Sequence, residues 1–233
     1  MTSGPHATII NRIAREALQP LGFSQKGRSR LWYADHGWHA LVVEFQPSSW
    51  SKGTYCNAGA MWLWDPDPVR THWVFHVHRR IQTSAGDFAS FESEGQFETV
   101  TGELARGAVE TIGEMGAKFR TIGGVASFYG DQPPVGWPGY HGAIALGLLG
   151  QAPDAERRFH AVSSSATGSE IRWIAAMGER ARSLADLVRN GEAFRETIRR
   201  DIATTRKALR LPAIEDPLLT GRAGDARIRS RRR

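Results

Sequence analysis

The sequence predicts an α+β fold: an antiparallel sheet covered by helices on one face, followed by an all-helical C-terminal region. Two observations predict it. Short runs between residues 29 and 80 alternate in hydropathy and are separated by turns without intervening helices, which favours antiparallel pairing. Apolar residues at helical spacing lie on both sides of these runs, and helical patterns alone continue after residue 140.

The first half of the chain supplies the sheet and two helices. One helix is expected at 7–18, where apolar residues recur at three- and four-residue steps until Pro20 stops it. The alternating runs predict strands at 29–34, 38–46, 54–64 and 72–80, with a shorter fifth strand at 95–100. A second helix is expected at 102–119 with Thr101 as its cap, and both helices should cover the same apolar face.

Composition divides the chain into four parts. Residues 1–122 form the α+β domain, and 123–139, rich in Gly, Pro and aromatic residues, form a connection that packs down. Residues 140–211 form a helical region on or beside the first domain, and 212–233 form a basic tail. Two helices of about ten residues around Gly150 resemble one tetratricopeptide-type hairpin, and no second copy follows.

The charge is concentrated at one end. The chain has 233 residues and a net charge of +6, but Arg222 to Arg233 hold six arginines and one acid, which leaves +1 for the rest. The body therefore lacks the basic groove of a nucleic-acid-binding protein. No apolar run approaches the ~20 residues of a membrane helix, and no secretion signal opens the sequence. We expect a cytoplasmic protein without a membrane partner, and the single Cys56 is compatible with this.

Several short motifs resemble a known family. They are Leu-x-Pro-Leu-Gly-Phe at 18–23, Lys26-Gly27-Arg28, Trp32, Gln-Pro-Ser-Ser-Trp at 46–50 and Asn57-x-Gly59. In this order and spacing they are similar to the bacterial "domain of unknown function 4304" family, over residues 7 to 120. The resemblance implies an α+β domain in which a helix leads into an antiparallel sheet, and it implies no activity.

Polar residues within the predicted strands are the candidate binding residues. Gln46 and Asn57 are amides in strand interiors, where polar groups need partners, so they either pair with each other or contact a ligand. Glu44 shares a face with Gln46. Arg30 and Trp50 complete the set, because exposed Trp and Arg residues are typical of protein-binding hot spots.

Other residues of the predicted sheet have structural interpretations. Six of the eight tryptophans lie between residues 32 and 73; they are expected mainly in the core, although Trp62 and Trp64, like Trp50, exceed what one face needs. Gly59 in mid-strand indicates a bulge or an aromatic ring lying close over it. Cys56 stands beside apolar residues and is expected to be buried and inert.

Three histidines are the candidate metal ligands. His72, His76 and His78 fall on one face if 72–80 is a strand, and residues two apart on a strand lie roughly 7 Å apart, close enough to share a metal. Another ligand would come from His39, Glu44 or Asp65. Histidines on a solvent-facing strand are commoner than a metal site, so no cofactor is predicted, with a divalent metal as the alternative.

No catalytic motif accompanies these residues. The chain has neither Gly-x-Ser-x-Gly nor the spacing of a phosphate-binding loop. We therefore expect a non-catalytic module that binds another protein through the uncovered face of the sheet, in an immunity-like or regulatory role. The alternatives are a metal-dependent enzyme that uses the histidine-bearing strand, and nucleic-acid binding through the Arg222–Arg233 tail.

Overall fold

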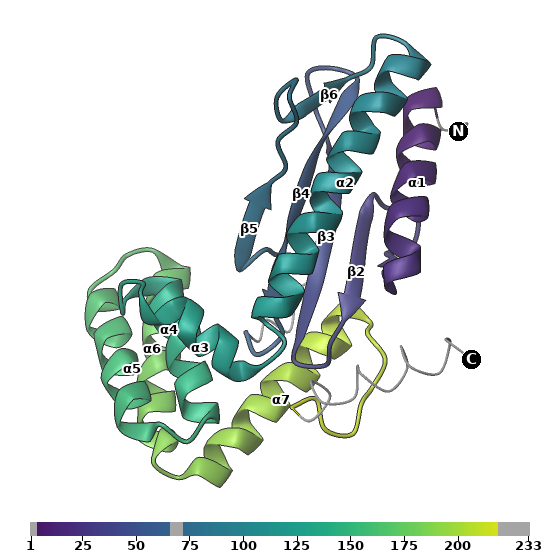
Figure 1. The fold of residues 1–233 in the computed structure, drawn as a ribbon. Coiled ribbons are helices and arrows are strands. Elements are labelled where there is room, and N and C mark those ends of the chain that lie inside the picture. The colour runs from purple at the N-terminus through teal and green to yellow at the C-terminus, as the bar shows by residue number, and fades with distance from the viewer. Residues whose placement is uncertain (1–3, 66–71, 219–233) are drawn as a thin grey trace.

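The computed structural model describes residues 4–65 and 72–218, with an antiparallel sheet between helices and a lobe of further helices beside it (Figure 1). The main path of the sheet follows chain order: β1 (Ser24–Gln25), β2 (Leu31–Asp35), β3 (His39–Pro47), β4 (Gly53–Trp62) and β5 (Val77–Arg80). A further strand, β6 (Phe88–Ser90), also pairs with β4, and all pairings are antiparallel. The predicted α+β class is confirmed.

The register of the strands decides which side chains share a face. Val42 of β3 pairs with Gly59 of β4, and Glu44 pairs with Asn57. Asn57 in turn pairs with Arg80 of β5. Residues directly opposite each other in antiparallel strands point to the same side, so these five lie on one face, which we call the second face. The alternating residues form the opposite side, which we call the helix face.

Two helices cover the helix face. They are α1 (Pro5–Leu18), followed by the short helix η1 (Gln19–Leu21), and α2 (Glu94–Lys118), which lies beside α1 along the sheet (Figure 1). The contact is close, because a Cβ added to Gly116 of α2 would lie only 3.4 Å from Leu41 Cδ1. The prediction that both helices cover the same face is confirmed.

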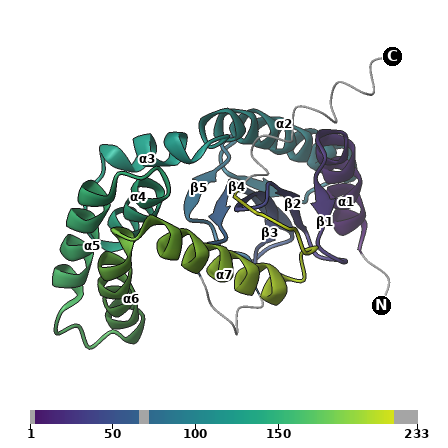
Figure 2. The same ribbon diagram turned by 90° about the horizontal axis from the view of Figure 1, so that it is seen from below.

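The second face is covered along part of its length. Helix α7 (Gly191–Leu209) runs across it, on the opposite side of the sheet from α1 and α2 (Figure 2). Before β5, Trp73 stacks on Tyr33 with ring centroids 4.5 Å apart, and Phe75 lies over Gly59, as expected for that glycine. Helix α7 and the segment before β5 therefore cover part of the face that the sequence predicts to be uncovered; at its polar end Asn57 is buried, and the Arg80 side chain is 32% exposed.

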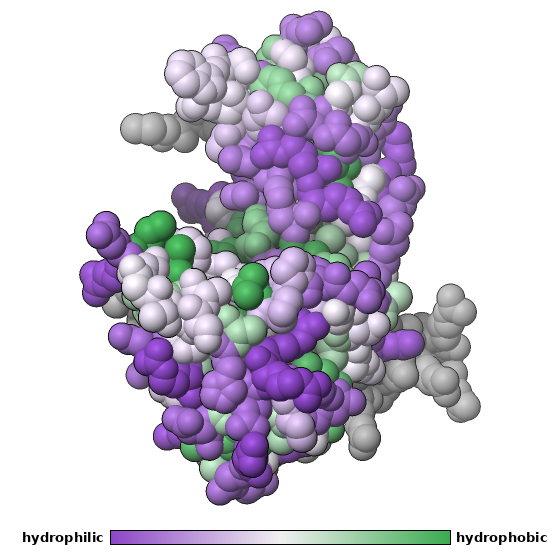
Figure 3. Space-filling view, turned by 90° about the vertical axis from the view of Figure 1, so that its left-hand side faces the viewer, coloured by the Kyte–Doolittle hydropathy of each residue, from purple (hydrophilic) through white to green (hydrophobic). Residues whose placement is uncertain are grey.

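The C-terminal lobe consists of helices α3 (Ile122–Gly130), α4 (Gly136–Leu148), α5 (Ala152–Ala166) and α6 (Arg172–Val188). Helix α5 packs between α4 and α6, and a buried hydrogen bond from Trp62 Nε1 to Tyr129 Oη, 2.8 Å long, joins α3 to the sheet. Seen from the lobe, the surface is hollowed between lobe and sheet (Figure 3). The α4–α5 hairpin is present, but its likeness to a tetratricopeptide repeat is not confirmed.

One predicted strand is wrong. Residues 95–100 belong to α2, and the cap is Ser93 rather than Thr101, because Ser93 Oγ accepts the N–H of Gln96 at 3.3 Å. A run of six residues is too short to distinguish the 3.6-residue period of a helix from the two-residue period of a strand. The helical period becomes visible only when Thr101 is included, because it is buried one turn after buried Phe97. The helix therefore begins two turns earlier than its most apolar stripe suggested.

Other boundaries also differ from the prediction. The segment 123–139 contains most of α3, whose Val125 and Tyr129 are buried. Helix α5 continues through a run of three serines to Ala166. The strand expected at 72–80 begins only at Val77, so the alternation of its first half reflects a segment that crosses the sheet without pairing as a strand.

Candidate functional site

The polar end of the second face holds a ring of hydrogen bonds between three side chains. Asn57 Nδ2 donates to Gln46 Oε1 at 2.9 Å, which confirms that the two amides meet. Arg80 joins both: its Nη2 donates to Gln46 Oε1 at 3.1 Å, and its Nε donates to Asn57 Oδ1 at 3.2 Å. The pairing of Asn57 with Arg80 across β4 and β5 brings the guanidinium to the amides. We call Gln46, Asn57 and Arg80 the amide–arginine cluster.

Aromatic and acidic neighbours hold the guanidinium from other sides. Its Cζ lies 4.2 Å from the centroid of the Tyr55 ring, within cation–π range, and its Nη1 lies 3.6 Å from Asp87 Oδ2. The Arg80 side chain is nevertheless 32% exposed. The site therefore presents to solvent an arginine whose position is fixed before any ligand arrives.

His78 also hydrogen-bonds to Asn57. His78 Nε2 lies 3.0 Å from Asn57 Oδ1, so this nitrogen carries the proton and donates it. Burial, and then the charge of Arg80, lower the pKa of His78, which keeps the imidazole neutral at pH 7. This histidine thus acts here as a hydrogen-bond donor to an amide.

Glu44 lies beside the cluster on β3, opposite Asn57. Burial raises the pKa of its carboxyl, and a hydrogen bond with Asn57 partly offsets that effect. This half-buried carboxyl and the fixed Arg80 lie on either side of Asn57, so the face offers a ligand both an acidic and a basic group. No nucleophile accompanies it among the cluster residues, and the free Cys56 is fully buried on the opposite face, as expected.

Arg30 and Trp50 lie apart from the amide–arginine cluster. Both line a cavity at the turn between β3 and β4, and Trp50 is 96% exposed there. Trp62 and Trp64, which exceed what one face of the predicted sheet needs, are core residues, since both are fully buried. The five predicted binding residues therefore divide into two groups: Glu44, Gln46 and Asn57 on the second face, and Arg30 with Trp50 at the turn.

The three candidate metal ligands do not share a strand face. His72 and His76 precede β5, and only His78 belongs to it. His76 Nδ1 accepts the backbone N–H of Trp62 at 2.8 Å, while its Nε2 lies 3.3 Å from Asp65 Oδ2. His78 uses Asn57 instead. Within the described ranges, no group of three or more His, Cys, Asp or Glu side chains is arranged to hold a metal ion.

The sequence did not identify several residues at these sites. Arg80 and Tyr55 were assigned no role, although Arg80 follows His78 by two positions and so shares its face. His141 of α4 was also missed; its Nδ1 accepts a hydrogen bond from Trp64 Nε1 at 3.2 Å, and its ring lies 4.6 Å from that of His76. The alternation within β5 could have pointed to Arg80, but no local pattern pairs His141 with a residue 77 positions earlier.

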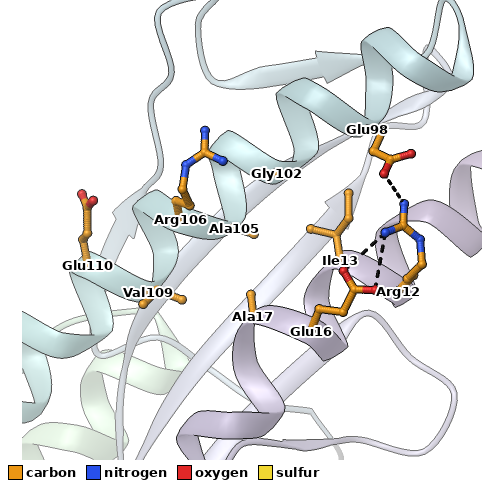
Figure 4. A pocket seen from close by; sticks show the side chains of 10 residues that line it. All are labelled: Arg12, Ile13, Glu16, Ala17, Glu98, Gly102, Ala105, Arg106, Val109 and Glu110. Atoms are coloured by element: carbon orange, nitrogen blue, oxygen red, sulfur yellow. Dashed lines mark hydrogen bonds and ion pairs between the residues drawn. The ribbon is translucent and has the colours of Figure 1, made fainter.

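A groove also runs between α1 and α2, with a volume of about 510 Å³ (Figure 4). Its floor is apolar and includes Ile13, Ala17 and Val109. Arg12 stands at one end, paired with Glu98 at 2.6 Å and with Glu16 at 3.3 Å. None of the predicted site residues lines this groove. The charge of Arg12 is already paired with Glu16 and Glu98, so this end of the groove has no unpaired arginine for a ligand among the described residues.

The comparisons with known proteins found no matching family model, no matching curated protein and no matching solved structure. The resemblance to the domain of unknown function 4304 family therefore stays a prediction. Among the described helices, none has the length and apolar character needed to cross a bilayer. The arginine-rich tail from Arg222 to Arg233, with its proposed nucleic-acid contact, lies outside the described residues.

Proposed function

We propose that this protein is a non-catalytic protein-binding module, and that it contacts its partner through the amide–arginine cluster and Glu44. The observation that carries the proposal is the state of Arg80, which is ordered by Gln46, Asn57 and Tyr55 and is still about one-third exposed. Arginine and tyrosine are enriched among the residues that dominate binding energy at protein interfaces.

Pre-organisation supports this role. An exposed arginine loses rotamer freedom when a partner immobilises it, at a cost of about 0.5–1.5 kcal/mol for a flexible side chain. In the cluster this cost is met during folding, because two amide oxygens and an aromatic ring already fix the guanidinium. The outward edge of the guanidinium then suits a carboxylate or a backbone carbonyl of the partner.

Neighbouring arginines on β5 provide a matched test. Arg79 and Arg80 point to opposite faces of the sheet, and Arg79 forms an exposed ion pair with Glu114 at 2.8 Å. Wild-type protein, Arg80→Ala and Arg79→Ala would be immobilised and exposed to lysate of the source cells. Captured proteins would be quantified by mass spectrometry, and each specific partner would then be purified and its affinity measured by calorimetry.

We expect one or more partners to be retained by the wild type and by Arg79→Ala. Arg80→Ala should weaken binding by about 2 kcal/mol, or roughly 30-fold, as for a hot-spot residue. Circular dichroism of all three proteins checks that the fold is retained. The proposal is wrong if no partner is captured, or if Arg80→Ala binds every partner as tightly as Arg79→Ala does.

A further inference from the structure

The cavity that contains Arg30 and Trp50 is a second site, distinct from the amide–arginine cluster. It has a volume of about 340 Å³ and lies where the first turn of α1 meets the turn between β3 and β4. That volume is near the lower end of the range for small-molecule sites. Its residues therefore decide what kind of small molecule it suits.

The cavity is lined by basic side chains. His6, Arg30 and Lys52 contribute to its wall, and no Asp or Glu is among the described residues that line it. The three groups act on one another: burial lowers the pKa of His6, and the charges of Arg30 and then Lys52 lower it further. A concave wall with one sign of charge attracts a counter-ion of the opposite sign.

Arg30 has unused hydrogen-bonding capacity. Its Nη1 is buried and makes no hydrogen bond to any described residue, whereas buried nitrogen donors in proteins are nearly always paired. Because this atom has almost no accessible surface, the guanidinium would turn toward the cavity to donate to an anion there. Ser49 and Ser51 are also lining residues, and a serine hydroxyl is a further donor available to an anion.

The backbone around the cavity is consistent with an anion. His6 stands in the first turn of α1, a 14-residue helix whose first turn contains no acidic residue and whose N-cap, Gly4, makes no side-chain cap. The positive end of the helix dipole thus adds to the charge of the side chains. In the turn, Ser48 Oγ accepts the N–H groups of Trp50 and Ser51 at 3.1 and 3.3 Å, which holds the loop in shape.

Trp50 specifies the second part of the ligand. Its side chain is 96% exposed although it borders a basic cavity, so its indole face is free to stack on a planar ring. From these features we propose that the cavity binds a small molecule of the nucleoside monophosphate class, with its phosphate against Arg30 and Lys52 and its base on Trp50. This site is independent of the proposed protein-binding face.

The test compares three probes: adenosine 5′-monophosphate, inorganic phosphate and adenosine. Binding would be followed by calorimetry and by the indole N–H signal of Trp50 in ¹H–¹⁵N spectra, assigned with Trp50→Phe. We expect the monophosphate to bind most tightly, inorganic phosphate more weakly, and adenosine not measurably. Only the two phosphate-containing probes should titrate the site, and the monophosphate should move the Trp50 signal.

Matched variants separate the site from general electrostatics. Arg30→Gln should weaken monophosphate binding about tenfold or more, as expected for the loss of a charge-assisted hydrogen bond. Arg28→Gln removes the same charge from an exposed position outside the cavity and should have little effect. Lys52→Gln provides a second variant in case Arg30→Gln is poorly folded. Trp50→Ala should abolish the preference for the monophosphate over inorganic phosphate.

Three outcomes would overturn the proposal: no binding of the monophosphate at millimolar concentration, equal weakening by Arg28→Gln and Arg30→Gln, or tight binding of a single-stranded oligonucleotide without binding of the monophosphate. Capture of a protein partner should be unchanged in Arg30→Gln. The two proposals can therefore fail separately.

Discussion

Arg206 ties the C-terminal helix to the start of the sheet, and its replacement by methionine is the most informative single change in stability. The guanidinium donates two hydrogen bonds to Asp35 at 2.7 Å each, one to the carbonyl of Gly37 at 2.8 Å, and two to the carbonyl of Pro212 at 2.6 and 3.2 Å. The Arg206 side chain is only 4% exposed and that of Asp35 24% exposed. Helix α7 therefore reaches the β2–β3 hairpin through a nearly dry ion pair.

The magnitude follows from what the substitution leaves behind. Removing one partner of a buried ion pair costs about 3–5 kcal/mol, because the other charge remains uncompensated. Asp35 would keep some access to water and its hydrogen bond from the Gly37 N–H at 3.0 Å, which places Arg206→Met at the lower end of that range. Methionine retains most of the apolar stem. We therefore expect a loss of about 3 kcal/mol, or about 6–12 °C in melting temperature for a chain of this size.

Urea and thermal unfolding, followed by circular dichroism and by tryptophan fluorescence, would measure the loss. Coincident transitions from the two probes are required before a single free energy of unfolding is calculated. Lys207→Met is the matched control: it removes one positive charge from the next residue of α7, which is exposed, and should change stability by less than about 0.5 kcal/mol. A loss below about 1 kcal/mol for Arg206→Met, or one equal to that of Lys207→Met, would refute the reasoning.

Other predictions concern the sheet and α2. Gly59→Ala should cost about 3 kcal/mol in urea unfolding, because its Cβ would lie 2.1 Å from the Val77 carbonyl oxygen, whereas Gly113→Ala, with nothing within 4 Å, should gain about 0.8 kcal/mol; equal effects would contradict the close approach at β5. Glu44→Gln should raise the melting temperature at neutral pH and lose this advantage near pH 4. Burial raises the pKa of the folded Glu44 carboxyl, so folding favours its neutral form and penalises its ionised form. The wild type keeps its full stability below the unfolded pKa of about 4.3 and loses it, relative to the Gln variant, as pH rises through the folded pKa. A difference between the two proteins that does not change with pH would exclude this explanation. Cys56 should resist thiol reagents in the native protein and react after denaturation, since burial raises its pKa, and rapid native labelling would show that the site opens.

Side-chain alternation was sufficient to predict much of the sheet. The faces of β3 and β4 follow directly from their period of two, so Gln46 and Asn57 could be expected to meet. A glycine in mid-strand predicts either a bulge or an aromatic ring lying close over it, and Phe75 lies over Gly59. The burial of Cys56 followed from its apolar neighbours. These properties depend on residues close in sequence or on strands joined by a short turn, where few alternative pairings exist.

Long-range arrangement was beyond the same patterns. The alternation of residues 72–76 matches a strand, yet this segment crosses the sheet, and only pairing with β4 reveals where β5 begins. The ring of Gln46, Asn57 and Arg80 depends on that register. The covering of the second face by α7 involves the ion pair between Arg206 and Asp35, which lies 171 positions earlier. No local sequence pattern at either residue predicts such a distant partner.

The return of α7 to the β2–β3 hairpin has a consequence for synthesis on the ribosome. The six described strands have been synthesised once the chain reaches residue 90. Helix α7 and the residues after it, which cover the second face of the sheet, are complete only when the chain has grown to about residue 218. At roughly 5–20 residues per second, this interval lasts on the order of 10 s. During this interval, the end of the sheet that holds Asp35 and Asp65 lacks its contacts with Thr205 and Arg206 of α7. We expect chains truncated before Gly191 to aggregate or to bind chaperones, because the sheet cannot be covered on its second face until the last helix has been made.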